Sequence, residues 1–164
     1  MGKTLVIYYS AQGHTKRAAE IVAKTLGADL FEIPMDNPYT EEDLDWNDPD
    51  SRCNRDWNSE IGRDEGPEKA EVPNWDEYDT VVLGYPIWYA FAAFPMSSFV
   101  GGRDFKGKTI YPFCTSHSSD VGDSDIKLKH IIKPPLDEVN WYNAVRFFQD
   151  APETEIADWA KSLK

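Results

Sequence analysis

Five short apolar runs are spaced along the chain, and each has the length of a β-strand. They cover residues 4–9, 29–33, 80–84, 109–113 and 144–148. Leu5-Val6-Ile7 and Val81-Val82-Leu83 are continuously apolar and do not alternate with polar residues. Strands covered on both faces have this composition, because helices pack against each side of a parallel sheet. The pattern therefore predicts five strands of a buried parallel sheet.

Helical periodicity fills the intervals between these runs. From His14 to Leu26 apolar residues recur on one face of a helix, and Gly27 follows where a C-terminal cap is expected. Further helices are expected at 93–100, at 123–132 and after a stretch at 150–153 that resembles a capping box. Strands that alternate with helices predict a three-layer α/β fold with right-handed crossovers.

Two features disturb this regular alternation. Pro112 has no amide proton for a sheet ladder, so it favours an edge position for the strand at 109–113. Residues 34–74 carry most of the Pro, Asp, Glu and Asn of the chain and no sustained period, and we call them the excursion. We expect it to lie against the domain, with a short helix starting near Thr40, since it also contains large apolar residues: Tyr39, Leu44, Trp46, Trp57 and Ile61.

Composition narrows the classes of protein and partner. The 41% apolar content is enough for one sizeable core, so we expect residues 1–164 to form a single domain. With 29 acidic against 17 basic residues, the net charge of -12 argues against nucleic acid and anionic membranes. It favours basic protein partners, although solubility alone would explain it equally well. No apolar run is long enough for a membrane span, and we expect a cytoplasmic protein.

The first loop has the composition of a phosphate site. Ser10-Ala11-Gln12-Gly13-His14-Thr15 runs from the first strand into the first helix, where free backbone amides and two hydroxyls can surround a phosphate. Its residues would equally suit an ordinary capped turn, in which Ser10 or Thr15 satisfies the first amides of the helix.

The residues that several other kinds of functional site require are missing or wrongly spaced. The loop has neither a cysteine for a tyrosine phosphatase nor the G-x-x-x-x-G-K-[ST] pattern of a nucleotide-binding loop. Cys53 and Cys114 are far apart, form no C-x-x-C pair and are expected to be reduced. The acidic pairs of the excursion lack the spacing of a calcium loop, and no metal site is predicted.

Three motifs together resemble the flavodoxin family. They are Y-Y-S-A-Q-G-H-T at 8–15, L-G-Y-P-I-W-Y at 83–89 and G-K-T-I-Y-P-F-C-T-S at 107–116. The resemblance extends in order over nearly the whole chain and includes a Pro-Tyr-Thr-Glu-Glu-Asp stretch at 38–43. It implies a flavodoxin-like, five-stranded parallel sheet of order 2-1-3-4-5 with helices on both faces, and one non-covalently bound FMN.

The resemblance also implies a set of FMN-binding residues. The phosphate would be ringed by Ser10, Gln12, Gly13, His14 and Thr15. The isoalloxazine ring would be flanked by Pro86, Ile87, Trp88 and Tyr89, since an aromatic side chain can stack on it. Its polar edge would be contacted by Thr115, Ser116, His117, Asp120, Val121 and Gly122. The chain departs from the family pattern in having Gln12 where Thr is usual and Ala90 where Gly is usual.

The resemblance implies an electron carrier that passes low-potential electrons between redox proteins, such as a reductase and an acceptor, and that is a monomer. Two alternatives stay open. One is an FMN-dependent reductase of quinones or nitroaromatics that uses NAD(P)H, and the other is a non-enzymatic binding module with weakened affinity for FMN. No catalytic residue is predicted.

Overall fold

A parallel sheet forms the centre of the computed structural model, which describes residues 2–59 and 70–163. Its main strands, in spatial order, are β2 (Asp29–Glu32), β1 (Lys3–Tyr8), β3 (Tyr78–Trp88), β5 (Thr109–Ser116) and β7 (Val145–Phe148). In chain order this is 2-1-3-4-5, so the expected topology is confirmed. Two further strands of two residues were not predicted: β6 (Asn140–Trp141) pairs with β5, and β4 (Phe91–Ala92) pairs antiparallel with β3.

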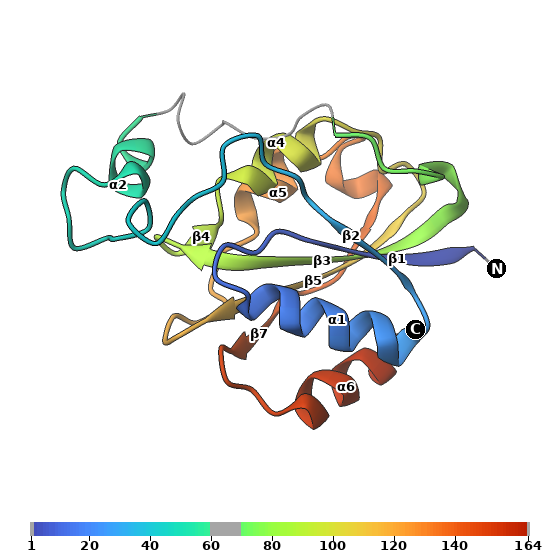
Figure 1. Cartoon of the computed structure of the whole chain (residues 1–164). Coiled ribbons are helices and arrows are strands. Elements are labelled where there is room, and N and C mark those ends of the chain that lie inside the picture. The colour runs from blue at the N-terminus through green and yellow to red at the C-terminus, as the bar shows by residue number, and fades with distance from the viewer. Residues whose placement is uncertain (1, 60–69, 164) are drawn as a thin grey trace.

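Helices cover both faces of the sheet, as the three-layer prediction requires. Figure 1 shows α1 (His14–Leu26) and α6 (Glu153–Ser162) on one face, and α4 (Pro95–Gly101) and α5 (Ile126–Ile131) on the other. Among the described residues, the remaining helical segments are α2 (Arg52–Trp57) and two 3₁₀ turns, η1 (Trp75–Glu77) and η2 (Leu136–Glu138). Among the described residues, no helix combines the length and the apolar character needed to cross a membrane.

The first helix follows the sequence pattern residue by residue. Its buried stripe, which includes Ala18, Val22 and Ala23, packs on the sheet. Gly27 ends it in the left-handed region, at φ 61°, and its amide bonds to the carbonyl of Lys24. The last helix differs from its prediction at one point: α6 begins after Pro152 without a side-chain cap, so the stretch at 150–153 is not a working capping box.

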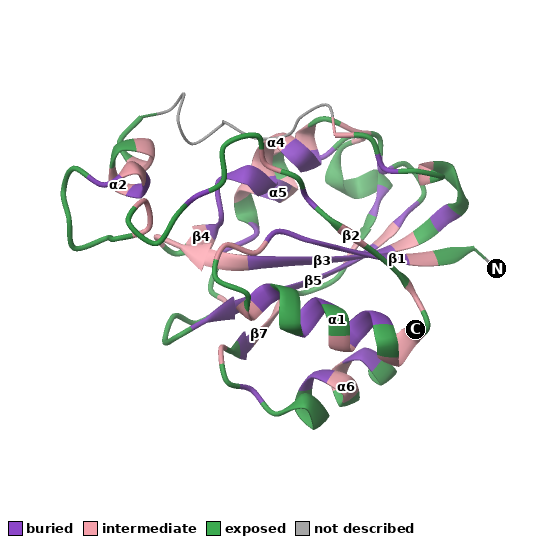
Figure 2. Cartoon of the chain, in the orientation of Figure 1, coloured by how far each residue is buried: buried purple, intermediate pink, exposed green. Residues whose placement is uncertain are grey.

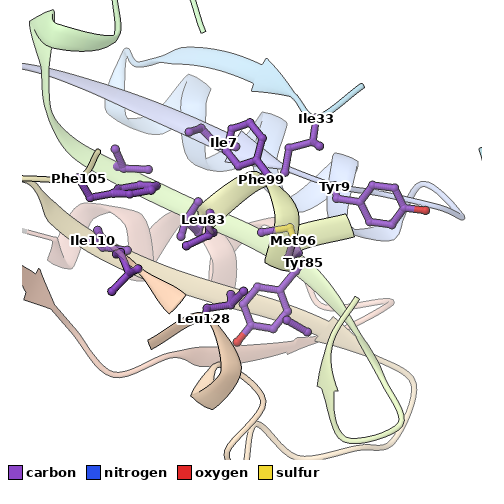
Figure 3. Packing of buried hydrophobic residues seen from close by; sticks show 14 of the residues in the cluster. Ile7, Tyr9, Ile33, Leu83, Tyr85, Met96, Phe99, Phe105, Ile110 and Leu128 are labelled. Carbon is purple, nitrogen blue, oxygen red and sulfur yellow. The ribbon is translucent and has the colours of Figure 1, made fainter. Parts of the chain in front are cut away.

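Apolar side chains fill the space between the layers. Figure 3 shows the larger cluster, which the sheet shares with α4 and α5 and in which Leu83, Met96 and Phe99 are fully buried. Burial of each such side chain contributes about 1.5–3 kcal/mol. Figure 2 shows β3 largely in the colour of buried residues, in agreement with its continuously apolar sequence. Position 84 of this strand has room only for glycine, because a Cβ there would lie 2.3 Å from the ring of Phe113.

Pro112 does not mark an edge strand, because β5 is paired on both sides. On one side Pro112 faces β3, opposite Leu83. On the other side β6 pairs only up to Ile110, and β7 begins pairing at Phe113. The proline therefore occupies the gap between two short partner strands, where no ladder needs its missing amide proton.

The strand expected at 80–84 is longer than predicted and includes the aromatic segment that follows Gly84. β3 continues to Trp88, then folds back through Tyr89 and Ala90 onto β4, so that Trp88 pairs with Phe91. Both turn residues have positive φ, 51° and 70°, as a two-residue hairpin turn requires. The strand thus extends beyond the layers and carries aromatic side chains at its tip.

The excursion lies against the domain only in part. The expected helix near Thr40 is a turn, closed by reciprocal hydrogen bonds between Thr40 and Asp43, and the helix forms instead at Arg52–Trp57 behind its cap Ser51. Tyr39 is buried, whereas Trp46 is 71% exposed. Figure 2 shows most of the described excursion in the colours of exposed and intermediate residues. Ile61 lies outside the described residues.

Candidate functional site

A cleft of about 650 Å³ opens at the carboxyl ends of β1, β3 and β5. This is where ligands bind in open parallel sheets, and the volume is in the range of small-molecule and cofactor sites. Its wall consists of Ser10, Ala11, Gln12, His14, Thr15, Leu44, Trp46, Cys53, Pro86, Ile87, Trp88, Tyr89, Thr115, Ser116, His117, Ser118, Ser119 and Gln149.

One end of the cleft is the loop that leads into α1. The hydroxyl oxygen of Ser10 accepts the Gly13 amide proton at 3.0 Å and closes the loop. Gly13 has φ 93°, and a Cβ there would meet nothing within 4 Å, so its role is conformational and does not depend on crowding. Within the described part of the chain, no side chain caps the start of the helix.

The start of α1 therefore presents backbone donors to the cleft. The Gly13 carbonyl accepts the first helical bond from Arg17, so the amides of His14, Thr15 and Lys16 have no acceptor within the helix. Together with the positive end of the helix dipole, they suit a dianion such as phosphate. We call this part of the cleft, residues 10–16, the phosphate end.

A threonine pair adjoins the phosphate end. The side-chain oxygens of Thr15 on α1 and Thr115 on β5 are 2.7 Å apart and share a hydrogen bond. Both residues are buried, and both contribute to the wall of the cleft. The bond ties the first turn of α1 to the carboxyl end of β5.

The opposite end of the cleft is aromatic. We call it the ring end, and it comprises the hairpin tip at 87–92 together with the parts of the excursion that pack on it. Trp88 meets the edges of Tyr9, at 5.7 Å between centroids, and of Tyr39, at 4.9 Å. These nearly perpendicular contacts, at 88° and 70°, are a favourable aromatic geometry and fix the plane of the indole.

Tyr89 is held by the excursion. Its ring stacks on Trp57 with centroids 4.9 Å apart and planes 9° apart. Its hydroxyl donates to the side-chain oxygen of Asn54 and also lies 3.4 Å from the sulfur of Cys53. Burial raises the pKa of the Tyr89 hydroxyl above its ordinary value, so this group stays a donor further into the alkaline range.

A second set of contacts anchors the excursion next to Trp88. The guanidinium of Arg52 lies over the ring of Tyr39 at 3.8 Å, and its Nε is 3.6 Å from the carboxylate of Asp56. Asp56 also accepts the hydroxyl proton of Tyr39. Burial raises the pKa of Tyr39, which keeps this hydroxyl protonated.

The loop at the carboxyl end of β5, residues 116–119, also lines the cleft. The Ser116 hydroxyl donates to the Ser119 carbonyl and closes the loop on itself. Asp120 points away to Arg146, with which it forms an ion pair at 3.1 Å. One terminal nitrogen of Arg146 is buried and without a hydrogen-bond partner in the part of the chain that the structure describes.

Most of the residues expected to bind FMN meet in this one cleft. The wall contains Ser10, Gln12, His14, Thr15, Pro86, Ile87, Trp88, Tyr89, Thr115, Ser116 and His117. The residues outside it are Gly13, Asp120, Val121 and Gly122. Whether these side chains touch a bound flavin stays a prediction.

Several wall residues were missed. Gln149 directly follows the strand at 144–148, so its position at the same sheet edge was open to inference. Leu44, Trp46 and Cys53 come from the excursion, whose sequence gives no sign of which surface it covers. Within residues 2–59 and 70–163, no group of three His, Cys, Asp or Glu side chains is placed to hold a metal ion.

Comparison with known proteins places the chain in a family. A model of the flavodoxin family matches residues 3–163. A candidate flavoprotein from Bacteroides uniformis has 33% sequence identity and a TM-score of 0.84, over 98% of this chain and 99% of that one. A candidate flavoprotein from Bacteroides eggerthii has 36% identity and a TM-score of 0.83, over 100% of both chains.

A more distant structure extends the comparison. A flavoprotein from Lactobacillus acidophilus, solved in complex with FMN, has 20% identity and a TM-score of 0.64 over 98% of this chain and 99% of that one. No curated protein matches the sequence. The family match over nearly the whole chain, together with the fold, shows that this protein belongs to the flavodoxin family.

Proposed function

We propose that this protein binds FMN in the cleft and carries electrons between other proteins. The observation that carries the proposal is the pairing, within one cleft, of uncapped helix amides at one end and an aromatic wall at the other. FMN has a phosphate at one end and a planar ring system at the other, so its chemistry matches both ends. Bound FMN supplies a site that accepts and releases electrons.

The residues of the cleft fit FMN in chemical type. The amides of His14, Thr15 and Lys16 and the hydroxyl of Thr15 would hold the phosphate. Trp88 and Tyr89 would lie against the ring, where their apolar faces exclude water. Polar groups of the loop at 116–119 would meet the heteroatom edge of the ring, in agreement with what the family resemblance implies.

The charge around the cleft supports a carrier that docks with basic proteins. Glu41, Glu42 and Asp45 are exposed on the turn that supplies Leu44 and Trp46 to the wall. Trp46 itself is 71% exposed at this rim. An acidic rim beside a redox group raises the encounter rate with a positively charged partner, and salt screens the effect over about 8–10 Å.

Electron transfer to a basic acceptor tests the proposal. The FMN-loaded protein is reduced and mixed with a small basic haem protein, cytochrome c, while the rate is followed at increasing salt. We expect the rate to fall several-fold between low and physiological salt. A rate that is independent of salt would contradict docking through the acidic rim.

Matched variants distinguish the effect of the charges at the rim on the transfer rate from the effect of the total charge. Glu41→Gln, Glu42→Gln and Asp45→Asn together remove three charges at the rim, whereas Glu153→Gln, Glu155→Gln and Asp158→Asn remove three from the exposed face of α6. The first triple variant should slow the transfer at low salt and the second should not. Equal effects would contradict the proposal.

Two further results would overturn the carrier function. Rapid turnover of NADPH with a quinone by the purified protein alone would identify a reductase. A protein that stays colourless and leaves flavin fluorescence unquenched in excess FMN would instead be a binding module without the cofactor.

A further inference from the structure

The threonine pair has more hydrogen-bonding capacity than its own bond uses. Thr15 and Thr115 each carry one hydroxyl proton, and the 2.7 Å contact between their oxygens uses one of the two. The second proton is available to another acceptor. Because both residues line the cleft, a ligand in the cleft is placed to provide that acceptor.

The direction of the bond depends on what lies at the phosphate end. Thr15 belongs to the first turn of α1, among the uncapped amides, whereas Thr115 belongs to β5. An anion held by those amides attracts the proton of Thr15, since hydrogen bonds to a charged acceptor are about twice as strong as neutral ones. If Thr15 gives its proton to the anion and the bond between the two threonines is kept, Thr115 must be the donor in that bond.

We propose that Thr115 is a positioning residue for the phosphate end, which donates to the Thr15 hydroxyl and thereby directs the Thr15 proton at the phosphate. This inference rests on the proposed binding of FMN. It gives Thr115 a different role from the one that the family resemblance implies, which is contact with the polar edge of the ring.

The backbone around Thr115 suits a fixed donor. β5 is paired at this residue on both sides, with Pro86 of β3 and with Phe147 of β7. The hydroxyl is therefore carried by the rigid centre of the sheet and not by a loop. A donor held in this way reaches Thr15 without a conformational cost at the moment of binding.

Riboflavin provides the test because it has the ring and the ribityl chain of FMN but no phosphate. Dissociation constants for FMN and riboflavin are measured by flavin fluorescence for the wild type, Thr115→Val and Thr115→Ser. We expect Thr115→Val to weaken the binding of FMN about three- to tenfold. The affinity for riboflavin should stay within about twofold of that of the wild type. Thr115→Ser keeps a hydroxyl at this position, and its affinity for FMN should lie within about twofold of that of the wild type.

Two results of these titrations would contradict the role proposed for Thr115. If Thr115→Val weakens FMN and riboflavin equally, Thr115 contacts the flavin beyond its phosphate and the inference is wrong. It is also wrong if neither affinity changes. Circular dichroism checks the fold, and Thr115→Ala is the second variant without a hydroxyl should the valine variant not fold. A wild type that binds neither flavin would overturn the proposed function itself.

Discussion

The two ends of the cleft are built in opposite ways. The phosphate end is one continuous stretch, residues 10–16, whose donors are backbone amides fixed by the start of α1. The ring end brings together the hairpin tip with Tyr39 and α2, which are separated from it by dozens of residues. Backbone donors follow from local structure, whereas the aromatic wall depends on how a long segment docks.

This difference has consequences for stability. The phosphate end is supported by the helix and by the sheet, whose bonds are cooperative. The ring end depends on a few aromatic and polar contacts to a largely exposed segment. Segments with few buried contacts open at low free energy, so the ring end should open before the phosphate end does.

Removal of the stacking partner of Tyr89 should have the largest effect. Trp57→Ala removes the ring stacked on Tyr89 at 4.9 Å, leaves only the more distant parallel ring of Phe94 at 6.2 Å, and should cost about 2–3 kcal/mol in unfolding free energy. We expect about tenfold weaker binding of both FMN and riboflavin, measured by fluorescence titration. The matched control is Trp159→Ala on α6, which removes an indole packed on Phe113 and Phe147, none of which lines the cleft. Should both variants bind flavin equally well, the excursion does not hold the ring end in place.

Gly13→Ala should affect the phosphate end alone. An L-residue at φ 93° costs about 1–2 kcal/mol, and a shift of this turn misplaces the amides behind it. FMN should bind about tenfold more weakly, and riboflavin should bind as to the wild type. Gly27→Ala places the same kind of strain, at φ 61°, at the other end of α1 and should lower stability without an effect on FMN. An equal loss of riboflavin binding would contradict the division of the cleft into two ends.

A smaller effect of opposite sign is expected at the hairpin tip. Ala90 has φ 70°, a conformation that glycine adopts without strain. Ala90→Gly should raise the unfolding free energy by about 0.5 kcal/mol, because relief of strain exceeds the entropy lost on folding. Urea denaturation measures this change. A lower stability would mean that the surrounding contacts, and not the turn, determine the conformation of residue 90.

Alkaline pH should weaken the ring end gradually. Burial raises the pKa of Tyr9, Tyr39 and Tyr89 above the ordinary value of about 10. Below pH about 10 these groups are protonated in both states, and stability does not depend on them. Above it the unfolded chain ionises first, so the unfolding free energy falls as pH rises. Tyr89→Phe should make this fall shallower in urea denaturation; an unchanged slope would contradict the role of Tyr89.

The sequence predicts the phosphate end well because its signals are local. The apolar stripe and the glycine cap define α1 to the residue, and a strand followed by Ser10 and Gly13 places the loop at the sheet edge. The strand order came from the family resemblance, since no local pattern contains it.

The ring end was predicted only in part, for physical reasons. Trp88 and Tyr89 were recognised by type, but the pairing that extends β3 and forms the hairpin is a contact between segments and leaves no periodic trace. The docking of Trp57 on Tyr89 is equally non-local. Trp46 shows the converse, because a large apolar residue was expected to be covered and is exposed. Such positions are decided by packing and not by propensity.

A crystal structure of the protein grown with saturating FMN tests the central claim most directly. The account places the phosphate on the amides of His14, Thr15 and Lys16 and the ring against Trp88 or Tyr89. An empty cleft, or a phosphate bound away from the start of α1, would contradict it.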